Sequence, residues 1–303
     1  MAVEYAKVLH ALNVGFEVVG RGTASASRFF ETTGISAHIG GIEAYLDTID
    51  YKPEQAIVCV TENMLGEATR TLLRKGVKSI LVEKPGGLTP EDVMQTEAIS
   101  RQVNAEVFVG YNRRFYASVI KAQEIIKADG GVSSLYFEFT EWSHVIEELQ
   151  KAPGVKENWF LANSSHVVDL AFYLGGNPLD ICCFTAGGVN WHPSAAVFAG
   201  AGKTETGALF SYHANWGAPG RWSLEVMTRA HRLVFKPIEK LHIQKIGSIL
   251  VEECPIDDEL DKNYKPGLYR QTELFLRNNK KLLTLSEQAN LMEWYLKINN
   301  KHN

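Results

Sequence analysis

The first third of the chain alternates strand-like and helix-like patterns of apolar residues. Short apolar runs stand at Ala56–Val60, Val77–Glu83 and Ala105–Gly110, and helical patterns such as Glu67–Lys75 separate them. Short buried strands that alternate with helices are typical of a parallel sheet covered on both faces. We therefore predict a doubly wound α/β domain of the Rossmann type, which binds a dinucleotide, over residues 1–117.

The pattern changes after this domain. Beyond one predicted helix, Ser118–Lys127, apolar and polar residues alternate with period two, as in strands with one buried face. The predicted strands are Ser134–Trp142, Ile181–Ala186, Ala195–Ala199, Gly207–His213, Trp222–Thr228, His231–Phe235 and Leu241–Ile246. We assign residues 118–303 to an α+β domain with a large, mainly antiparallel open sheet that binds substrate. A homodimer or homotetramer would cover the open face of such a sheet.

The front of the first domain lacks an expected part. A dinucleotide-binding domain begins with a strand, a glycine loop and a helix, and the glycines let the backbone approach the pyrophosphate. Here Met1–Leu12 already has the pattern of that first helix, and the glycine fingerprint is absent. Because the first strand normally lies mid-sheet, its loss leaves two neighbours unpaired. Either the true start of the protein lies upstream, or another segment fills the gap.

Composition limits the classes of binding partner and the cell compartment that we expect for the protein. The 31 lysines and arginines against 35 acidic residues give a net charge of −4, without the basic excess of a nucleic-acid-binding protein. No apolar stretch approaches the ~20 residues of a membrane span, and the N-terminus does not read as a secretory signal. We expect a cytoplasmic protein with reduced core thiols and no metal site, because Cys59, Cys182, Cys183 and Cys254 lack metal-ligand spacing.

Polar residues follow two of the predicted strands. Lys84 ends the run to Glu83 and is followed by Pro85, at the carboxyl end of a parallel strand where ligands of such sheets bind. The segment Tyr-Asn-Arg-Arg-Phe ends the next strand, and a later helix carries His166-x-x-Asp169 and closes with Leu-Gly-Gly. In this order and spacing, the sequence resembles the Gfo/Idh/MocA family of glucose–fructose oxidoreductase and inositol 2-dehydrogenase-like NAD(P)-dependent enzymes, over nearly the whole chain.

The resemblance implies a dehydrogenase or reductase that moves a hydride between a nicotinamide and a carbinol carbon of a sugar, sugar derivative or nucleotide sugar. It implies that Lys84 and His166 flank that carbon, while Glu83 and Pro85 shape the cofactor side. A histidine with a pKa near ~6.5 exchanges protons at neutral pH, so His166 suits the proton carrier and Lys84 the polarising group. Members of the family commonly carry an aspartate four residues before the histidine. Here that position is Ala162, so we expect a Lys84–His166 dyad.

The expected cofactor is NADP, with NAD as the alternative. After the predicted strand that ends at Val19, Arg21 with Thr23 and Ser25 would suit a 2′-phosphate. The loop after Val60 corresponds to the family's loop over the cofactor, although its usual histidine is Gly66 here. The residues assigned to the cofactor are Arg21, Thr23, Ser25, Thr61, Asn63, Glu83, Pro85 and Asn112.

The substrate residues are chosen among polar and aromatic side chains of the second domain. Arg113, Arg114 and Arg270 suit either a diphosphate or structural ion pairs. Asp169, three residues after His166, either orients the imidazole or pairs locally. The residues assigned to substrate are Arg113, Asn163, Asp169, His213 and Tyr269.

Two other functions stay open. One is a non-catalytic sugar-binding or regulatory protein that keeps the fold without the pyrophosphate loop. The other is an enzyme whose bound NAD(P) is reduced and reoxidised within one turnover, without net NADPH formation. Cofactor affinity separates the first from a dehydrogenase, and cofactor retained through purification would indicate the second.

Overall fold

The computed structural model describes residues 1–277 and 281–300, and this part of the chain divides into two compact units. Unit 1 is built from Met1–Asn112 together with residues from Leu260–Asn290. Unit 2 is built from Arg113–Glu259 and the described residues from Leu291 on. The functional division at residue 117 stays a prediction, and the return of Leu260–Asn290 to unit 1 has no counterpart in the sequence pattern.

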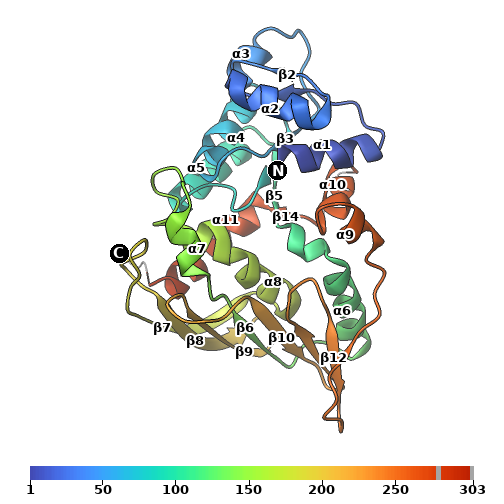
Figure 1. The fold of residues 1–303 in the computed structure, drawn as a ribbon, viewed down its shortest axis with the longest axis vertical. Coiled ribbons are helices and arrows are strands. Elements are labelled where there is room, and N and C mark those ends of the chain that lie inside the picture. The colour runs from blue at the N-terminus through green and yellow to red at the C-terminus, as the bar shows by residue number, and fades with distance from the viewer. Residues whose placement is uncertain (278–280, 301–303) are drawn as a thin grey trace. The chain divides into compact units, whose positions relative to one another are not determined.

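A parallel sheet forms the centre of unit 1, as predicted. In the described residues it has the order β14-β5-β4-β3, with β3, β4 and β5 parallel and the short β14 antiparallel at one edge (Figure 1). The strand bounds are β3 Gln55–Val58, β4 Ser79–Glu83, β5 Glu106–Gly110 and β14 Leu283–Thr284. Because β14 has only two residues, no period-two pattern predicts it.

Helices and one short 3-10 turn connect these strands. Their bounds are η1 Glu62–Met64, α4 Leu65–Arg74 and α5 Pro90–Gln102. Helix α5 begins with a capped turn, because the Thr89 side chain accepts a hydrogen bond from the Asp92 backbone nitrogen at 3.3 Å, and Pro90 is the first helical residue. Asp92 also ties α5 to α4, since its Oδ1 accepts a hydrogen bond from Arg70 at 2.5 Å. The close approach needs Gly66, where a Cβ would lie 2.2 Å from Asp92 Oδ1.

A second, separate sheet of unit 1 pairs β1 (Val18–Val19) with β2 (Ala37–His38) in parallel. Around it lie α1 (Ala2–Ala11), α2 (Thr23–Thr33) and α3 (Ile42–Leu46). Among residues 1–277 and 281–300, β1 pairs only with β2, and β3 pairs only with β4. No described segment therefore fills the gap that the sequence pattern predicts between the two halves of the sheet.

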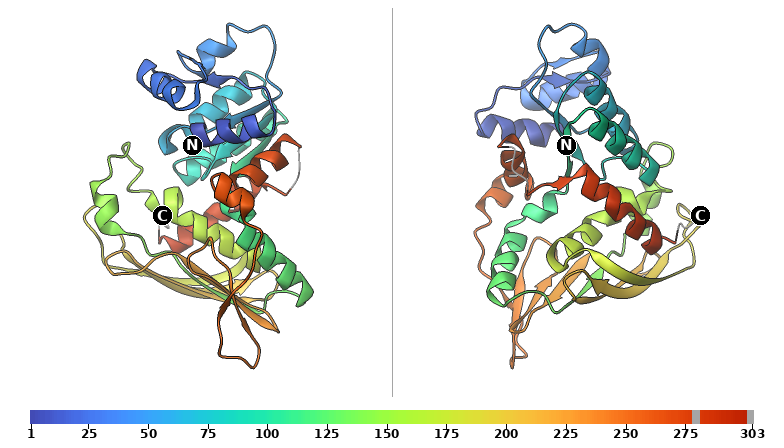
Figure 2. Two further views of the ribbon diagram at one scale, coloured as in Figure 1. Left: turned by 45° about the vertical axis from the view of Figure 1, so that its right-hand side comes forward. Right: turned by 180° about the vertical axis from the view of Figure 1, so that it is seen from behind.

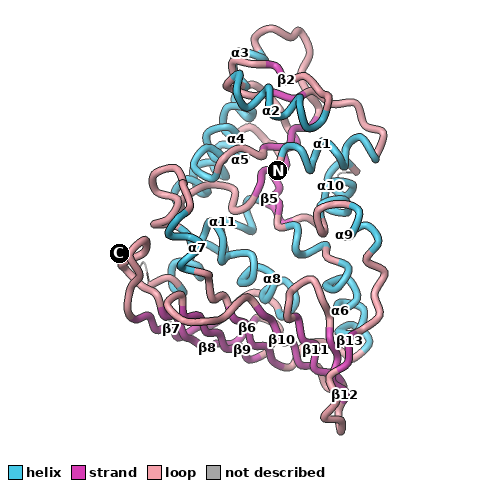
Figure 3. Tube along the Cα trace, viewed as in Figure 1, coloured by secondary structure: helices cyan, strands magenta, loops and turns pink. Residues whose placement is uncertain are grey.

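The prediction of a large, mainly antiparallel open sheet is confirmed, and this sheet lies in unit 2. Within the described chain it has eight strands in the order β13-β12-β11-β10-β6-β9-β8-β7, and only β6 and β9 form a parallel pair (Figure 3). Their bounds are β6 Ser134–Glu138, β7 Pro178–Ala186, β8 Val197–Thr204, β9 Leu209–Asn215, β10 Ser223–Met227, β11 His231–Phe235, β12 His242–Lys245 and β13 Glu252–Glu253. The period-two pattern predicts all of these except the two-residue β13.

Helix α8 (Ser165–Gly175) packs along one face of this sheet (Figure 2). Aromatic side chains make the contact. The Phe137 ring of β6 meets Phe172 of α8 edge-on at 5.8 Å and stacks on Tyr212 of β9 at 5.4 Å. Tyr212 crosses the neighbouring strand at Gly200, where a Cβ would lie 2.4 Å from the tyrosine hydroxyl. The absence of a side chain at Gly200 therefore admits the ring.

The other helical segments complete the two units. They are η2 (Asn112–Phe115), α6 (Ala117–Ala128), α7 (Ser143–Glu148), the π-helical turn η3 (Phe160–Ser164), α9 (Glu259–Asn263), α10 (Leu268–Leu276) and α11 (Leu285–Ile298). In the described residues, no helix combines the length and apolarity that a membrane crossing requires.

The cysteines are unpaired thiols in the described structure, but the prediction that they lie in the core is wrong. Cys182 is exposed on β7, and Cys59, Cys183 and Cys254 are only partly buried. The reason for Cys182 is the alternation of side chains along a strand, which turns every second residue of β7 to the open face.

Candidate functional site

Lys84 stands where the sequence predicts, directly after β4, and its bond to Pro85 is cis. The preceding Glu83 is buried and accepts a hydrogen bond from the Tyr5 hydroxyl at 2.7 Å. Gln271 donates to the same hydroxyl at 3.1 Å. Burial raises the pKa of Glu83, and burial followed by the Glu83 charge raises the pKa of Tyr5. The carboxylate is thus held from α1 and α10, two elements that the sequence pattern does not connect with it.

The turn after Lys84 is fixed from its other side by Gln288. Its amide nitrogen donates hydrogen bonds at 3.1 Å to the Pro85 carbonyl and to the Tyr111 hydroxyl. Gln288 itself is fully buried in α11. Two buried glutamines therefore hold the Glu83–Lys84–Pro85 segment, and neither was assigned to the site from the sequence.

The loop after β3 contains a polar atom without a partner. The side-chain oxygen of Asn63 in η1 is buried, and no donor reaches it among the described residues. Thr61, at the start of the same turn, is exposed. A buried acceptor without a donor costs ~1–3 kcal/mol, which a ligand donor at this edge of the sheet would offset.

The residues proposed for a 2′-phosphate lie together at the start of α2. Arg21, Thr23 and Ser25 are all exposed, and Gly22 is the N-cap of the helix. The backbone here is open, since a Cβ on Gly20 would meet no heavy atom within 4 Å. Exposed backbone N–H groups at a helix start and a neighbouring guanidinium suit an anion.

Asn112 is engaged elsewhere in unit 1. It is buried, and its amide nitrogen donates a hydrogen bond to the Pro266 carbonyl at 2.9 Å. The role in cofactor binding stays a prediction, which this contact does not favour.

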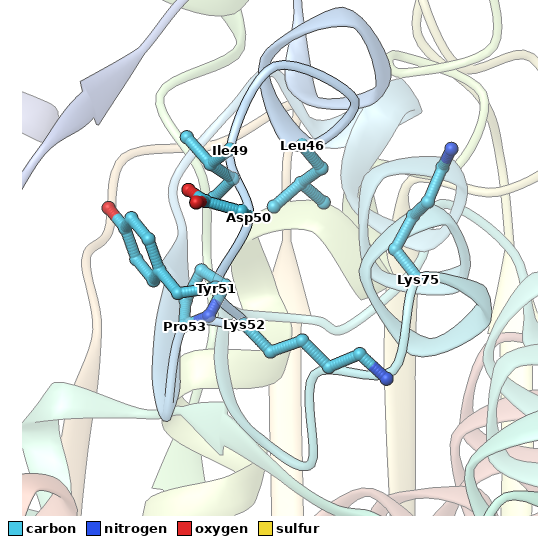
Figure 4. A pocket seen from close by; sticks show the side chains of 7 residues that line it. All are labelled: Leu46, Ile49, Asp50, Tyr51, Lys52, Pro53 and Lys75. Atoms are coloured by element: carbon cyan, nitrogen blue, oxygen red, sulfur yellow. The ribbon is translucent and has the colours of Figure 1, made fainter.

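A small pocket lies at the amino ends of the parallel strands, opposite to the ends that Lys84 and Asn63 follow. It is lined by Ile49, Tyr51 and Lys52 in the segment before β3 and by Lys75 after α4 (Figure 4). These residues lie at the amino ends of the parallel strands, whereas ligands of such sheets bind at the carboxyl ends. The pocket is therefore not a candidate for the cofactor site.

His166 lies near the start of α8 in unit 2 and is buried, with 6% of its surface exposed. Its ring centroid lies 6.0 Å from that of Trp222, also buried, which directly precedes β10. Lys84 belongs to unit 1 and His166 to unit 2.

A buried carboxylate that the sequence analysis missed lies close to this helix. Glu141, three residues after β6, is 2% exposed. Its oxygens accept hydrogen bonds from Asn163 at 3.0 and 3.1 Å and from Ser164 at 2.8 Å. Burial, opposed by these bonds, raises the pKa of Glu141 from 4.5 to about 7. No motif marks Glu141, because its partners come from a segment more than twenty residues away.

Two arginines lie over the Trp222 ring. The guanidinium carbon of Arg113 is 4.7 Å from the ring centroid, and that of Arg221 is 4.6 Å from it. Arg221 also covers Trp142 at 4.7 Å and reaches Glu141 at 3.5 Å. Of these residues, only Arg113 was assigned to the site from the sequence.

Asp169 forms an ion pair with Arg114. Its two oxygens accept hydrogen bonds from Arg114 at 2.9 and 2.6 Å, and Asp169 is fully buried. Of the two alternatives for this residue, the structure has the local pair. The assignment of Asp169 to substrate stays a prediction that the pair does not support.

His213 does not join the residues around His166. His213 is exposed on β9, whereas its neighbour Tyr212 points to the face that α8 covers, so His213 lies on the other face of the sheet. Tyr269 belongs to α10 of unit 1, where its ring lies 5.0 Å from that of Tyr264.

No protein-family model matches the chain, and no curated protein matches it by sequence. Solved structures of the same fold do exist. A putative NADPH-dependent oxidoreductase from Desulfitobacterium hafniense superposes with a TM-score of 0.79 at 16% identity, over 99% of this chain and 92% of the other. UDP-N-acetylglucosamine 3-dehydrogenase from Acidithiobacillus ferrooxidans gives 0.75 at 13% identity, over 98% and 93%.

The WlbA dehydrogenase from Chromobacterium violaceum, in complex with NADH and UDP-GlcNAcA, gives a TM-score of 0.74 at 16% identity, over 99% and 91% of the two chains. The chain therefore has the fold of NAD(P)-dependent oxidoreductases, as the family resemblance implied. At this identity, the likeness concerns the fold alone.

Proposed function

We propose that the protein is an NAD(P)-dependent oxidoreductase that transfers a hydride between a nicotinamide and a carbinol carbon of a sugar-like substrate. The observation that carries the proposal is Lys84 at the carboxyl end of β4, on a segment held by the buried Tyr5, Gln271 and Gln288. A solvated surface turn would need no such support. Proteins of the same fold act on sugars and nucleotide sugars by their names.

The residues present fit part of a nicotinamide dinucleotide. Asn63 offers a buried acceptor without a donor, and Thr61 is exposed beside it, at the edge where such cofactors bind. Arg21 with Thr23 and Ser25 would hold a 2′-phosphate, which favours NADP over NAD. When bound, the cofactor supplies the hydride acceptor or donor.

The chemistry of the chain's own residues follows from their types. In the oxidative direction, the substrate hydroxyl gives its proton to His166, and Lys84 donates a hydrogen bond to the oxygen from which that proton leaves. Glu141 is a carboxyl held next to Asn163 and Ser164, close in sequence to the position of Ala162.

Titration with NADPH and NADH, followed by cofactor fluorescence, tests the proposal first. Lys84→Met and His166→Ala are expected to keep cofactor affinity within about twofold and to lose turnover on a panel of sugars and nucleotide sugars. Lys203→Met, an exposed lysine of β8, is the matched control and should keep turnover. A chain that binds neither nucleotide but binds sugars would instead support the non-catalytic alternative.

A further inference from the structure

Two guanidinium groups lie against the ring of Trp222. Arg113 and Arg221 both lie over its ring, and the Glu141 carboxylate lies 3.5 Å from Arg221. The charges of Glu239 and Glu141 also act on Arg113. Glu141 is a weak counter-ion at neutral pH, because burial raises its pKa to about 7. Burial and, to a smaller extent, the charge of Arg221 lower the pKa of Arg113. An anion bound beside the two guanidinium groups would offset this repulsion.

Arg113 differs from the other arginines that the sequence offered for a diphosphate. Arg114 is neutralised by Asp169 at 2.6 Å, and Arg270 by Asp261 at 2.7 Å. For Arg113, the described residues provide no carboxylate within ion-pair distance, and its buried Nε atom has no acceptor. The nearby charges of Glu239 and Glu141 act on it from beyond that distance.

A purely structural role does not explain this arrangement. Stacking on Trp222 and Tyr116 satisfies the flat faces of the Arg113 guanidinium but leaves the N–H groups at its edge. A buried N–H donor without an acceptor costs ~1–3 kcal/mol. A planar carboxylate or a phosphate accepts two such bonds at once, which is the geometry that arginine serves best.

The position of the pair connects it with the reaction. Trp222, which carries both guanidinium groups, is also the ring beside His166. An acidic group bound there would place the rest of its molecule within reach of the imidazole. Arg221 keeps 44% of its side chain exposed, so an anion has access to the pair from solvent.

We propose that Arg113 and Arg221 form a binding site for an acidic group of the substrate, a carboxylate or a phosphoryl group, beside His166. The substrate class is then an acidic sugar derivative: a uronic acid, a sugar phosphate or a nucleotide sugar. This inference rests on the proposed function only in taking the bound acid to be a sugar-like substrate. The anion site itself belongs entirely to unit 2.

Isothermal titration of the whole chain without cofactor tests the site. The probes are D-glucuronate for a carboxylate, glucose 1-phosphate for a phosphoryl group, and D-glucose as the neutral reference. Comparison of the affinities for the two acidic probes shows which anion is preferred. We expect at least one acidic probe to bind at least tenfold more tightly than glucose, with an affinity that falls as salt rises.

The variants are Arg113→Gln and Arg221→Gln, with Arg229→Gln as a control at an exposed arginine of the same unit. Each of the first two should weaken the acidic probe at least tenfold, and the control should not. Because Arg113 is partly buried, Arg221→Gln, at an exposed side chain, keeps the test valid if the first variant does not fold.

Two results would overturn the site: acidic probes that bind no better than glucose, or acidic probes that bind equally well to Arg221→Gln. The outcome is separate from that of the proposed function. Acid binding without any nicotinamide binding would keep the anion site and reject the oxidoreductase. Turnover of neutral sugars, without preference for acidic ones, would keep the oxidoreductase and reject the anion site.

Discussion

Arg114 and Asp169 form a buried ion pair in which both carboxylate oxygens accept a hydrogen bond. The pair joins η2, directly after the Rossmann-type unit, to the helix that carries His166. Its first role is thus to fix α8. A substrate ligand would instead be open to solvent, whereas Asp169 is fully buried.

Asp169→Asn should therefore destabilise the protein more than it affects binding. The change leaves the Arg114 charge buried without a partner, which costs ~3–5 kcal/mol in other proteins. Urea unfolding measures the loss. Glu97→Gln, which breaks the exposed pair with Arg101, is the control and should change the unfolding free energy little. Unchanged stability with weakened sugar binding would return Asp169 to the substrate.

Glu141 should make stability fall as pH rises. Its folded-state pKa of about 7 lies above its ordinary 4.5, so the folded chain binds the extra proton between these values. The stabilisation by this proton is fully present below about pH 4.5 and is lost as pH rises through about 7, roughly 3 kcal/mol in all.

Glu141→Gln should remove this pH dependence, because the amide does not ionise. The unfolding free energy, measured in urea at pH 5 and pH 8, should then change less in the variant than in the wild type. Glu148→Gln, at an exposed glutamate, is the control and should keep the wild-type dependence. Parallel pH profiles for Glu141→Gln and the wild type would contradict the raised pKa.

Gly200→Ala should destabilise unit 2, because the new Cβ would lie 2.4 Å from the Tyr212 hydroxyl. Overpacking of this kind costs ~1–3 kcal/mol. Gly217→Ala is the control, since the nearest atom to its Cβ would lie at an ordinary 3.5 Å. Equal melting temperatures for the two variants would show that the tyrosine ring moves without cost.

The cofactor preference should depend on Arg21. Hydrogen bonds to charged groups contribute ~1.5–3 kcal/mol, so Arg21→Gln should lower the preference for NADPH over NADH by about tenfold or more. Fluorescence titration with both nucleotides measures the ratio, and Arg28→Gln, further along α2, is the control. An unchanged ratio would reject Arg21 as the phosphate ligand.

The expected homo-oligomer is testable at the open face of the large sheet. Phe184 on β7 is 67% exposed there, and Ile249, in the loop between β12 and β13, is 92% exposed. If the open face is the interface, Phe184→Glu should lower the mass in solution by light scattering, and Ile249→Glu should not. Dissociation by Ile249→Glu alone would move the interface to the loop.

The sequence predicted the elements whose patterns are local. The buried runs gave β3, β4 and β5, and the alternating segments gave the strands of the large sheet, because both patterns report the faces of a strand directly. Lys84 and His166 were found from motifs, and their joint action stays a prediction.

The missed parts all depend on contacts between distant segments. Glu141 is defined by Asn163 and Ser164, and Glu83 by Tyr5 and Gln271. His213 was assigned to the substrate because it ends a strand, but the strand's phase, set by Tyr212, turns it to the opposite face. The period-two pattern tells which residues share a face of the strand, but it does not tell which of the two faces the helix covers.

The return of Leu260–Asn290 to unit 1 also bears on the order in which the protein is made. Tyr5 and Glu83 leave the ribosome before Gln271 and Gln288, which hold this part of the site. The lysine segment therefore acquires its full support only after Gln288 has emerged. A chain released early, after Glu259 for example, would carry the Glu-Lys-Pro motif without the two glutamines that hold it.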